Sequence, residues 1–172
     1  MDAPEAENIY FRLNADLRML AAGTCDRTSV IDTWAPLMTT LLPALRTLPP
    51  FAGVVYRGLP ENVAAVYTAG KQVRFSAFTS ATTSADTAWE AARAGEVDAS
   101  RSTVLRLHIQ SGRQLLDLSV FPAEDEVLLL PNTTFAVSSA PHVATRLLPL
   151  SGQRLRATEI DLVELTGESY QY

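Results

Sequence analysis

Apolar residues recur at every third or fourth position in the first part of the chain, which is the spacing of one helix face. The pattern predicts a helix over about Pro4–Ala21, ended by Gly23. A second helix is predicted over Ser29–Leu48 on the same grounds. Pro36 and Pro43 stand inside it, and we expect them to kink the helix or split it.

Beyond Phe51 the apolar period shortens to two, which is the spacing of strands. Strands are predicted over Gly53–Arg57 and Val73–Ser80, with a short helix over Pro60–Ala69 between them. Thr103–Ile109 alternates most cleanly. The remaining predicted elements are a helix over Ala85–Ala94, capped by Ser84 or Thr83, and strands over Val127–Leu130, Thr134–Ser138, Val143–Pro149 and Glu159–Leu165.

Helices that come first and strands that follow are typical of an α+β domain, not of an alternating βαβ fold. The 172 residues fit one domain that is long enough to bury a full core. We therefore expect a single domain over 1–172, with a helical part over 1–48 and a mixed β core over 51–165.

Composition and charge narrow the class of protein. A hydrophobic fraction of 47% and a charged fraction of 19% are those of a globular protein. The net charge of −5, with no block of Lys or Arg, argues against nucleic acid as an obligatory partner. No apolar run is long enough to cross a membrane.

The single cysteine and the N-terminus bear on localisation. Cys25 cannot form an internal disulfide, which favours a reducing, cytoplasmic compartment. The acidic stretch over 1–8 lacks the features of a signal peptide, so export is expected only if such a segment has been removed. His108 has no second His or Cys at ligand spacing, and we expect no metal.

An acidic cluster, Glu124-Asp125-Glu126, runs directly into the apolar segment Val127–Leu130. In an extended segment Glu124 and Glu126 would point to the same face and Asp125 to the other. Two neighbouring carboxylates at the start of a buried strand suit acid/base chemistry or the stabilisation of a developing positive charge. An acidic turn that caps the strand would have the same pattern.

Two further segments are candidates for binding. Arg57 stands at the end of a predicted strand beside Gly58, whose bare backbone favours the approach of an anion. The next predicted strand ends at Ser80 and continues into a hydroxyl-rich turn that contains Thr82. Taken alone, Arg57 is more simply a solvent-exposed arginine at a strand end, and a turn of this kind usually caps a helix.

In combination these segments identify a family. Tyr56-Arg57-Gly58, Phe78-Thr79-Ser80-Ala81-Thr82 and Glu124-Asp125-Glu126 resemble the arginine, serine, glutamate series of mono-ADP-ribosyltransferases of the cholera-toxin-like and vertebrate-ectoenzyme type. Each motif lies at one end of a predicted strand, in the family's order, and the resemblance extends from about Tyr10 to Leu165. It implies N-terminal helices packed on a two-sheet β core, with the three motifs in one cleft and NAD as the substrate.

The resemblance also implies roles for single residues. Arg57 would hold phosphate and ribose oxygens of NAD, and the backbone of Gly58 would bind the nicotinamide amide. Ser80, with Thr82 as the second hydroxyl of its motif, would position Glu126. Glu126 would bind the ribose 2′-hydroxyl and stabilise the cation that forms when nicotinamide leaves.

The acceptor is the least determined part of this hypothesis. Glu124 stands where arginine-specific members carry an acid that orients and deprotonates the acceptor guanidinium, so a protein arginine is expected. Trp89 is a candidate for stacking on nicotinamide, although a place in the helix core fits it better. An NAD glycohydrolase and a silent NAD-binding domain remain alternatives. We expect a monomer.

Overall fold

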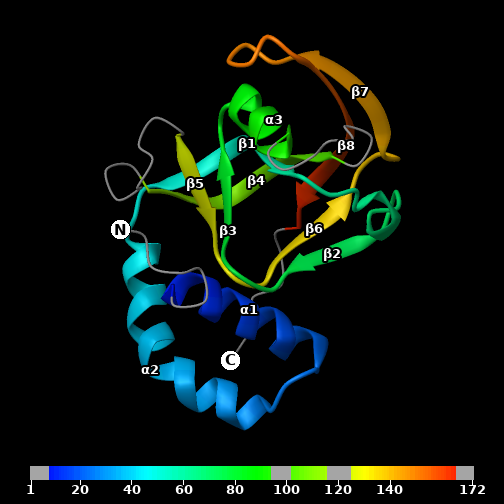
Figure 1. The fold of residues 1–172 in the computed structure, drawn as a ribbon. Helices are drawn as coiled ribbons and strands as arrows, with labels where there is room; N and C mark the ends of the chain where they lie inside the picture. The colour runs from blue at the N-terminus through cyan, green and yellow to red at the C-terminus, as the bar shows by residue number, and fades with distance from the viewer. Residues whose placement is uncertain (1–7, 94–101, 116–124, 166–172) are drawn as a thin grey trace.

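The protein is described by a computed structural model over residues 8–93, 102–115 and 125–165. Two helices precede a core of eight strands, and a third helix interrupts the strands (Figure 1). The elements are α1 Ile9–Ala22, α2 Arg27–Arg46, β1 Pro50–Leu59, a 3₁₀ turn Ala64–Val66, β2 Gln72–Phe75, β3 Thr79–Thr82, α3 Ala85–Arg93, β4 Thr103–Gln114, β5 Glu126–Leu129, β6 Thr133–Val137, β7 His142–Leu147 and β8 Arg154–Glu164. The predicted α+β class is confirmed.

Both N-terminal helices begin and end at residues that satisfy the free backbone groups of a helix end. The Asn8 side chain caps α1, and Gly23 ends it in the left-handed conformation, with φ of 67°. Asp26 caps α2 in the same way as Asn8 caps α1. α2 continues through Pro36 and Pro43, so the expected split does not occur.

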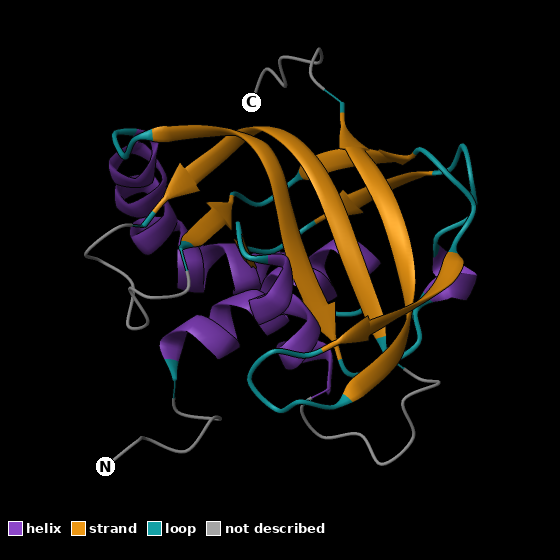
Figure 2. Cartoon of the chain, turned by 90° about the horizontal axis from the view of Figure 1, so that it is seen from above, coloured by secondary structure: helices purple, strands orange, loops and turns teal. Residues whose placement is uncertain are grey.

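The strands form one hydrogen-bonded network with β4 at its centre. β4 pairs with β1 and β5 in antiparallel fashion and with β8 in parallel. β3 bridges β1 and β5, so β1, β3, β5 and β4 close into a small barrel. β8 continues the network to β6 and β7, and β6 to β2. The strands curve strongly as a result (Figure 2).

Three buried clusters hold these layers together. The largest fills the barrel and its continuation, and consists of Val55, Ala81, Leu105, Leu107, Ile109, Val127, Leu129, Phe135, Val137, Ile160 and Leu162. A second cluster lies around Trp89 of α3. In the third, Leu13 of α1 and Trp34 of α2 pack against Phe78 and Leu128 of the β core. This cluster fixes α1 and α2 to the side of the barrel that carries β3 and β5.

The strand predicted over Val73–Ser80 is two strands in different places. β2 pairs with β6, whereas β3 pairs with β1 and β5. Between them Ala77 and Phe78 are both buried, which breaks the alternation of an extended strand. The buried Asn14 side chain of α1 accepts a hydrogen bond from the Phe78 N–H at 2.9 Å and fixes this bend. The prediction of one strand was wrong because the chain changes partner at a tertiary contact.

The helix predicted over Pro60–Ala69 is also wrong, since only the 3₁₀ turn Ala64–Val66 forms there. Side chains take the N–H groups that would begin a helix. Val63 N–H donates to the Thr103 hydroxyl at 3.2 Å, and Ala64 N–H donates to Asn62 Oδ1 at 3.0 Å. Such side-chain bonds to the backbone compete with regular helix formation.

α3 packs on β1 at a point that only glycine permits. A Cβ atom on Gly58 would lie 1.9 Å from the Ala88 carbonyl oxygen and 2.5 Å from the Ala92 nitrogen. The predicted helix cap is confirmed, since Thr87 N–H donates to the Ser84 hydroxyl at 3.2 Å. Gly58 therefore has a packing role in addition to the binding role that the sequence suggests.

Candidate active site

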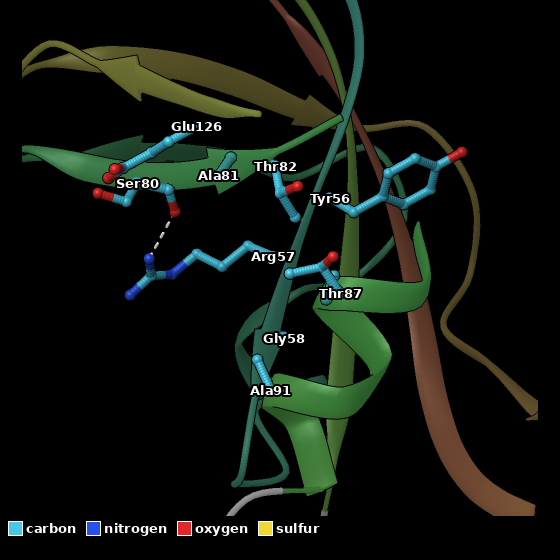
Figure 3. A pocket seen from close by; sticks show the side chains of 10 residues that line it. Tyr56, Arg57, Gly58, Ser80, Ala81, Thr82, Thr87, Ala91 and Glu126 are labelled. Atoms are coloured by element: carbon cyan, nitrogen blue, oxygen red, sulfur yellow. Dashed lines mark hydrogen bonds between the residues drawn. The ribbon is translucent and has the colours of Figure 1, made fainter. Parts of the chain in front are cut away.

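Arg57 and the serine segment meet because β1 and β3 are neighbours, with Tyr56 opposite Thr82. One terminal nitrogen of the Arg57 guanidinium donates to the backbone carbonyl of Ser80 at 2.6 Å (Figure 3). This bond fixes the arginine through the main chain of the serine motif and leaves the Ser80 hydroxyl uninvolved in it. The guanidinium keeps further donors for a ligand.

The electrostatic surroundings of Arg57 favour an anionic ligand. Burial lowers the pKa of the Arg57 guanidinium, as does the nearby Arg18, whereas Tyr10 and Tyr67 act in the opposite direction. Burial likewise raises the pKa of Tyr67, and the charge of Arg57 partly offsets this. None of the ion pairs that the described residues form includes Arg57. A half-buried cation that forms none of these ion pairs is well suited to bind phosphate.

Glu126 is the first residue of β5 and is held by the strands on both sides. It lies opposite Thr82 in the β3–β5 pairing. Its carbonyl accepts a hydrogen bond at 3.2 Å from Leu115 N–H, directly after β4. The side chain is half-buried. In Figure 3 the Glu126 carboxylate and the Ser80 hydroxyl point to the same side of the cavity.

The alternation expected across Glu124-Asp125-Glu126 is wrong at its middle residue. Asp125 is in the left-handed conformation, with φ of 45°, so the segment is not extended there. Its carbonyl accepts from Thr83 N–H at 3.4 Å, which holds this turn against the end of β3. Glu124 lies outside the described residues, and its expected place beside Glu126 stays a prediction.

A cavity of about 180 Å³ brings the described candidate residues together (Figure 3). Its lining contains every expected site residue of the described ranges, Glu124 being outside them. The lining residues are Tyr56, Arg57, Gly58, Ser80, Ala81, Thr82, Thr87, Ala88, Ala91 and Glu126. The three motifs, separate in sequence, thus converge on one space.

Sequence reasoning missed the contribution of α3 to this cavity. Thr87, Ala88 and Ala91 form one wall, opposite the strands that carry the motifs. The helix itself was predicted, and its cap at Ser84 fixes which turn comes first. The small alanine side chains of α3 next to Gly58 are the sequence signal of this close contact with β1. They can be interpreted in this way only when the two elements are known to be in contact.

A second, larger hollow of about 640 Å³ adjoins the first at Ser80 and Glu126. It lies between α1, α2 and the β core, and its walls are mostly apolar. The other lining residues are Asn8, Ile9, Tyr10, Phe11, Leu13, Leu37, Leu41, Leu45, Phe78, Leu115 and Leu128. Glu126 therefore stands between the cavity that contains the Arg57 guanidinium and an apolar hollow with aromatic side chains. Such a pair of spaces suits a ligand with both charged and ring-shaped parts.

Two other residues considered from the sequence, Trp89 and His108, lie outside the cavity. Trp89 is 1% exposed and packs in the cluster with Leu148 and Leu155, so its ring is helix core and cannot stack on a ligand in the cavity. His108 lies in the sheet between Val54 of β1 and Val163 of β8. Within the described ranges no three His, Cys, Asp or Glu side chains gather as metal ligands would.

A family model and two known proteins with similar sequences all belong to one class of enzyme. Residues 5–147 match the family model of the NAD:arginine ADP-ribosyltransferases. NAD(P)(+)–arginine ADP-ribosyltransferase 2 of Gallus gallus is 31% identical over 139 residues, which is 78% of this chain and 41% of that protein. The protein Mav of Mycobacterium avium (strain 104) is 35% identical over 98 residues, which is 56% of this chain and 11% of that protein. The chain thus spans less than half the length of either relative.

Solved structures share the fold. The ADP-ribosyltransferase Vis of Vibrio splendidus superposes with a TM-score of 0.66 at 21% identity, over 98% of this chain and 72% of that one. The enzymatic component C2-I of the Clostridium botulinum C2 toxin superposes with a TM-score of 0.63 at 15% identity, over 96% of this chain and 42% of that one. No helix in the described part of the chain has the length and apolar character needed to cross a membrane.

Proposed function

The chain belongs to the NAD:arginine ADP-ribosyltransferase family, and from this premise we propose that it transfers ADP-ribose from NAD to an arginine side chain of an acceptor protein and releases nicotinamide. One observation carries the proposal above all. The Arg57 guanidinium is bonded to the Ser80 carbonyl in a cavity that also contains Glu126, so an anion-binding group and an acid face one space.

NAD matches the two hollows in chemistry. Its pyrophosphate is the natural partner of the Arg57 guanidinium, whose planar fork suits phosphate oxygens. Its ring systems suit the apolar hollow, where Tyr10 and Phe78 line the wall. The ribose that joins nicotinamide to the pyrophosphate then lies at Glu126, the residue that both hollows share.

The bond that breaks is the one between the ribose C1 and the ring nitrogen of nicotinamide. Both electrons of this bond leave with nicotinamide, whose ring becomes neutral, and C1 becomes an oxocarbenium-like centre, as in glycoside cleavage. The Glu126 carboxylate stabilises this positive charge and accepts a hydrogen bond from the ribose 2′-hydroxyl. Because the group is fixed at the start of β5 before the reaction begins, little reorganisation is needed when the charge develops.

The acceptor step needs a second carboxylate. A free guanidinium is protonated at neutral pH and is a poor nucleophile. In the proposal Glu124 orients it and takes a proton, while the guanidinium nitrogen forms a new bond to C1. A structure of Vis contains agmatine, a small molecule with the same guanidinium group, which supports a guanidinium acceptor for this fold.

Incubation of the pure protein with NAD labelled in the adenine moiety tests the proposal. We expect labelled ADP-ribosyl-agmatine when agmatine is present, together with one nicotinamide, measured by chromatography, for each ADP-ribosyl group that leaves NAD. Free ADP-ribose as the only product, with or without agmatine, would identify an NAD glycohydrolase instead. Intact NAD in both samples would contradict any transferase role.

A further inference from the structure

β4 changes its partners at a bulge. Before the bulge it pairs with β8, and after it with β5, while β1 runs alongside both parts. On β1 a single residue, Ala52, lies between the pairs that flank this point, whereas on β4 two residues, Gln110 and Ser111, lie there. The extra residue bends β4 and takes backbone groups out of the ladder.

A buried carboxylate binds the bulge. Glu164, the last residue of β8, is only 7% exposed. Its Oε2 accepts from Gln110 N–H at 2.5 Å and from Ser111 N–H at 3.0 Å, and its Oε1 accepts from the Ser111 hydroxyl. Burial of a carboxylate is costly unless donors surround it, and these three donors supply that compensation.

Beyond the bulge, β4 pairs with β5, the strand that begins at Glu126. Arg113 and Gln114 lie opposite Leu128 and Val127 of β5. Leu115 N–H then donates to the Glu126 carbonyl at 3.2 Å. The direction in which β4 leaves the bulge therefore helps to determine where the backbone of Glu126 lies, together with the pairing to β3 on its other side.

The space around this bend is tight, so a change in its direction cannot be absorbed locally. A Cβ atom on Gly112, the first residue after the bulge, would lie 2.6 Å from the Ile109 Cδ1 and 2.7 Å from the Val127 Cγ1. Val127 follows Glu126 on β5. A shift of β4 at Gly112 would thus move the start of β5 with it.

We propose that Glu164 is a positioning residue for Glu126: its carboxylate keeps the β4 bulge in shape and thereby aims the strand whose first residue stabilises the reacting ribose. The proposal rests on the catalytic role proposed above for Glu126. It assigns to Glu164 a function that acts through backbone geometry and not through contact with NAD.

Glu164→Met tests the proposal, because the side chain keeps its length and loses both acceptor oxygens. The three donors of the bulge then have no carboxylate to bind. We expect kcat for nicotinamide release to fall on the order of 10²-fold, as misplacement of a reacting group does, with a much smaller change in KM for NAD. Glu159→Met, a like change on β8 in the pair with His142 at 3.3 Å, should leave kcat unchanged.

A general loss of protein stability could lower kcat as well, so a second variant distinguishes this effect from a misplaced Glu126. The buried Val137 of β6 provides the comparison, since Val137→Ala weakens the core and removes no hydrogen-bond partner of the bulge. Both variants are assayed at a temperature at which circular dichroism shows them fully folded. Unchanged kcat in Glu164→Met, or an equal loss of kcat in Val137→Ala at the same urea midpoint, would overturn the proposal.

Amide hydrogen exchange gives a readout that does not depend on activity. Exchange at Gln110, Ser111 and Leu115 should become faster in Glu164→Met and stay as in the wild type in Glu159→Met. If the wild type cleaves no NAD, the proposed function fails, while faster exchange at Leu115 would still show that Glu164 holds the start of β5. Unchanged exchange at Leu115 would overturn the positioning role whatever the activity.

Discussion

Arg57 and Glu126 have opposite electrostatic tasks at one cavity, and each would cancel the other if they formed an ion pair. In the proposed reaction Arg57 binds the negative pyrophosphate, whereas Glu126 faces a positive charge on the ribose. The structure bonds the guanidinium to the Ser80 carbonyl, a neutral acceptor. This bond fixes the arginine without using its charge, so the charge is kept for the substrate.

Glu126→Gln removes the charge at the reacting centre and keeps the shape. We expect nicotinamide release and transfer to fall together by a factor on the order of 10²–10³, because both follow the same cation-like state. NAD binding, measured by isothermal titration calorimetry, should weaken far less. Full turnover in this variant would mean that another acid, Asp125 or Glu124, stabilises the cation.

Glu124→Gln should separate the two steps instead of stopping both. The carboxylate is needed to orient and deprotonate a guanidinium, while water requires much less help against an oxocarbenium ion. We expect the ratio of ADP-ribosyl-agmatine to free ADP-ribose to fall by a factor on the order of 10². Chromatography of both products from one reaction gives this ratio. An unchanged ratio would assign Glu124 to the solvent-exposed turn that the sequence also allows.

At the scale of elements, α3 is the wall of the cavity that depends on distant support. It approaches β1 at Gly58, and side-chain contacts hold its outer face. Glu90 accepts from Arg93 Nε at 3.1 Å and from Ser151 N–H at 3.2 Å, while Asp86 pairs with Arg146 of β7 at 2.7 Å. The segment around β7 thus helps to keep the helix on the cavity.

The contacts of Glu90 predict a stability that depends on pH. Partial burial alone would raise the pKa of Glu90, but hydrogen bonds from Arg93 and Ser151 outweigh it, and the pKa lies below its ordinary value of 4.5. A group whose pKa is lower in the folded state stabilises the fold above the unfolded pKa, and this contribution is lost as the pH falls through the folded pKa. Glu90→Gln should therefore lower the urea midpoint at about pH 7 and have a much smaller effect at about pH 3.5.

The matched control for this prediction is Glu61→Gln, which changes an exposed carboxylate after β1. It should shift the urea midpoint little at either pH. If Glu90→Gln gives the same loss at both pH values, the shape of the side chain and not its charge supports α3.

The elements that the sequence predicted well are those whose own residues decide them. The helix ending at Gly23 and the cap at Ser84 rest on local backbone chemistry, and β4 rests on a clean alternation. The break between β2 and β3 could not be predicted, because Asn14, more than sixty positions away from Phe78, supplies the bond that fixes it. The bulge held by Glu164 was beyond reach for the same reason.

For the candidate site the division is similar. Arg57, Ser80 and Glu126 could be selected as candidates because short motifs can be matched to those of a family from the sequence alone. The wall of α3 and the apolar hollow between the helices and the barrel come only from packing. The expected alternation of the acids failed at Asp125, where the backbone turns into the left-handed region.

At the scale of the whole molecule, the helical layer and the β core share both a hydrophobic cluster and the apolar hollow beside Glu126. Leu13 and Trp34 pack on Phe78 and Leu128, and the same region of contact leaves the space beside Glu126. Separation of α1 and α2 from the barrel would expose this apolar surface to water and would open the hollow. The two parts should therefore fold as one cooperative unit.

The two tryptophans of the chain report on the two parts separately and make this testable. Trp34 lies in α2 and donates from Nε1 to Asp16 Oδ2 at 2.7 Å, whereas Trp89 lies in α3 and packs against β4 and β8 of the β core. In Trp89→Phe the fluorescence follows the helical layer, and in Trp34→Phe it follows the β core. Within each variant we expect the urea midpoint from fluorescence to coincide with that from far-ultraviolet circular dichroism, as two-state unfolding requires. A fluorescence transition at lower urea than the circular dichroism transition, in Trp89→Phe alone, would show that α1 and α2 detach first. The hollow beside Glu126 would then open before the β core unfolds.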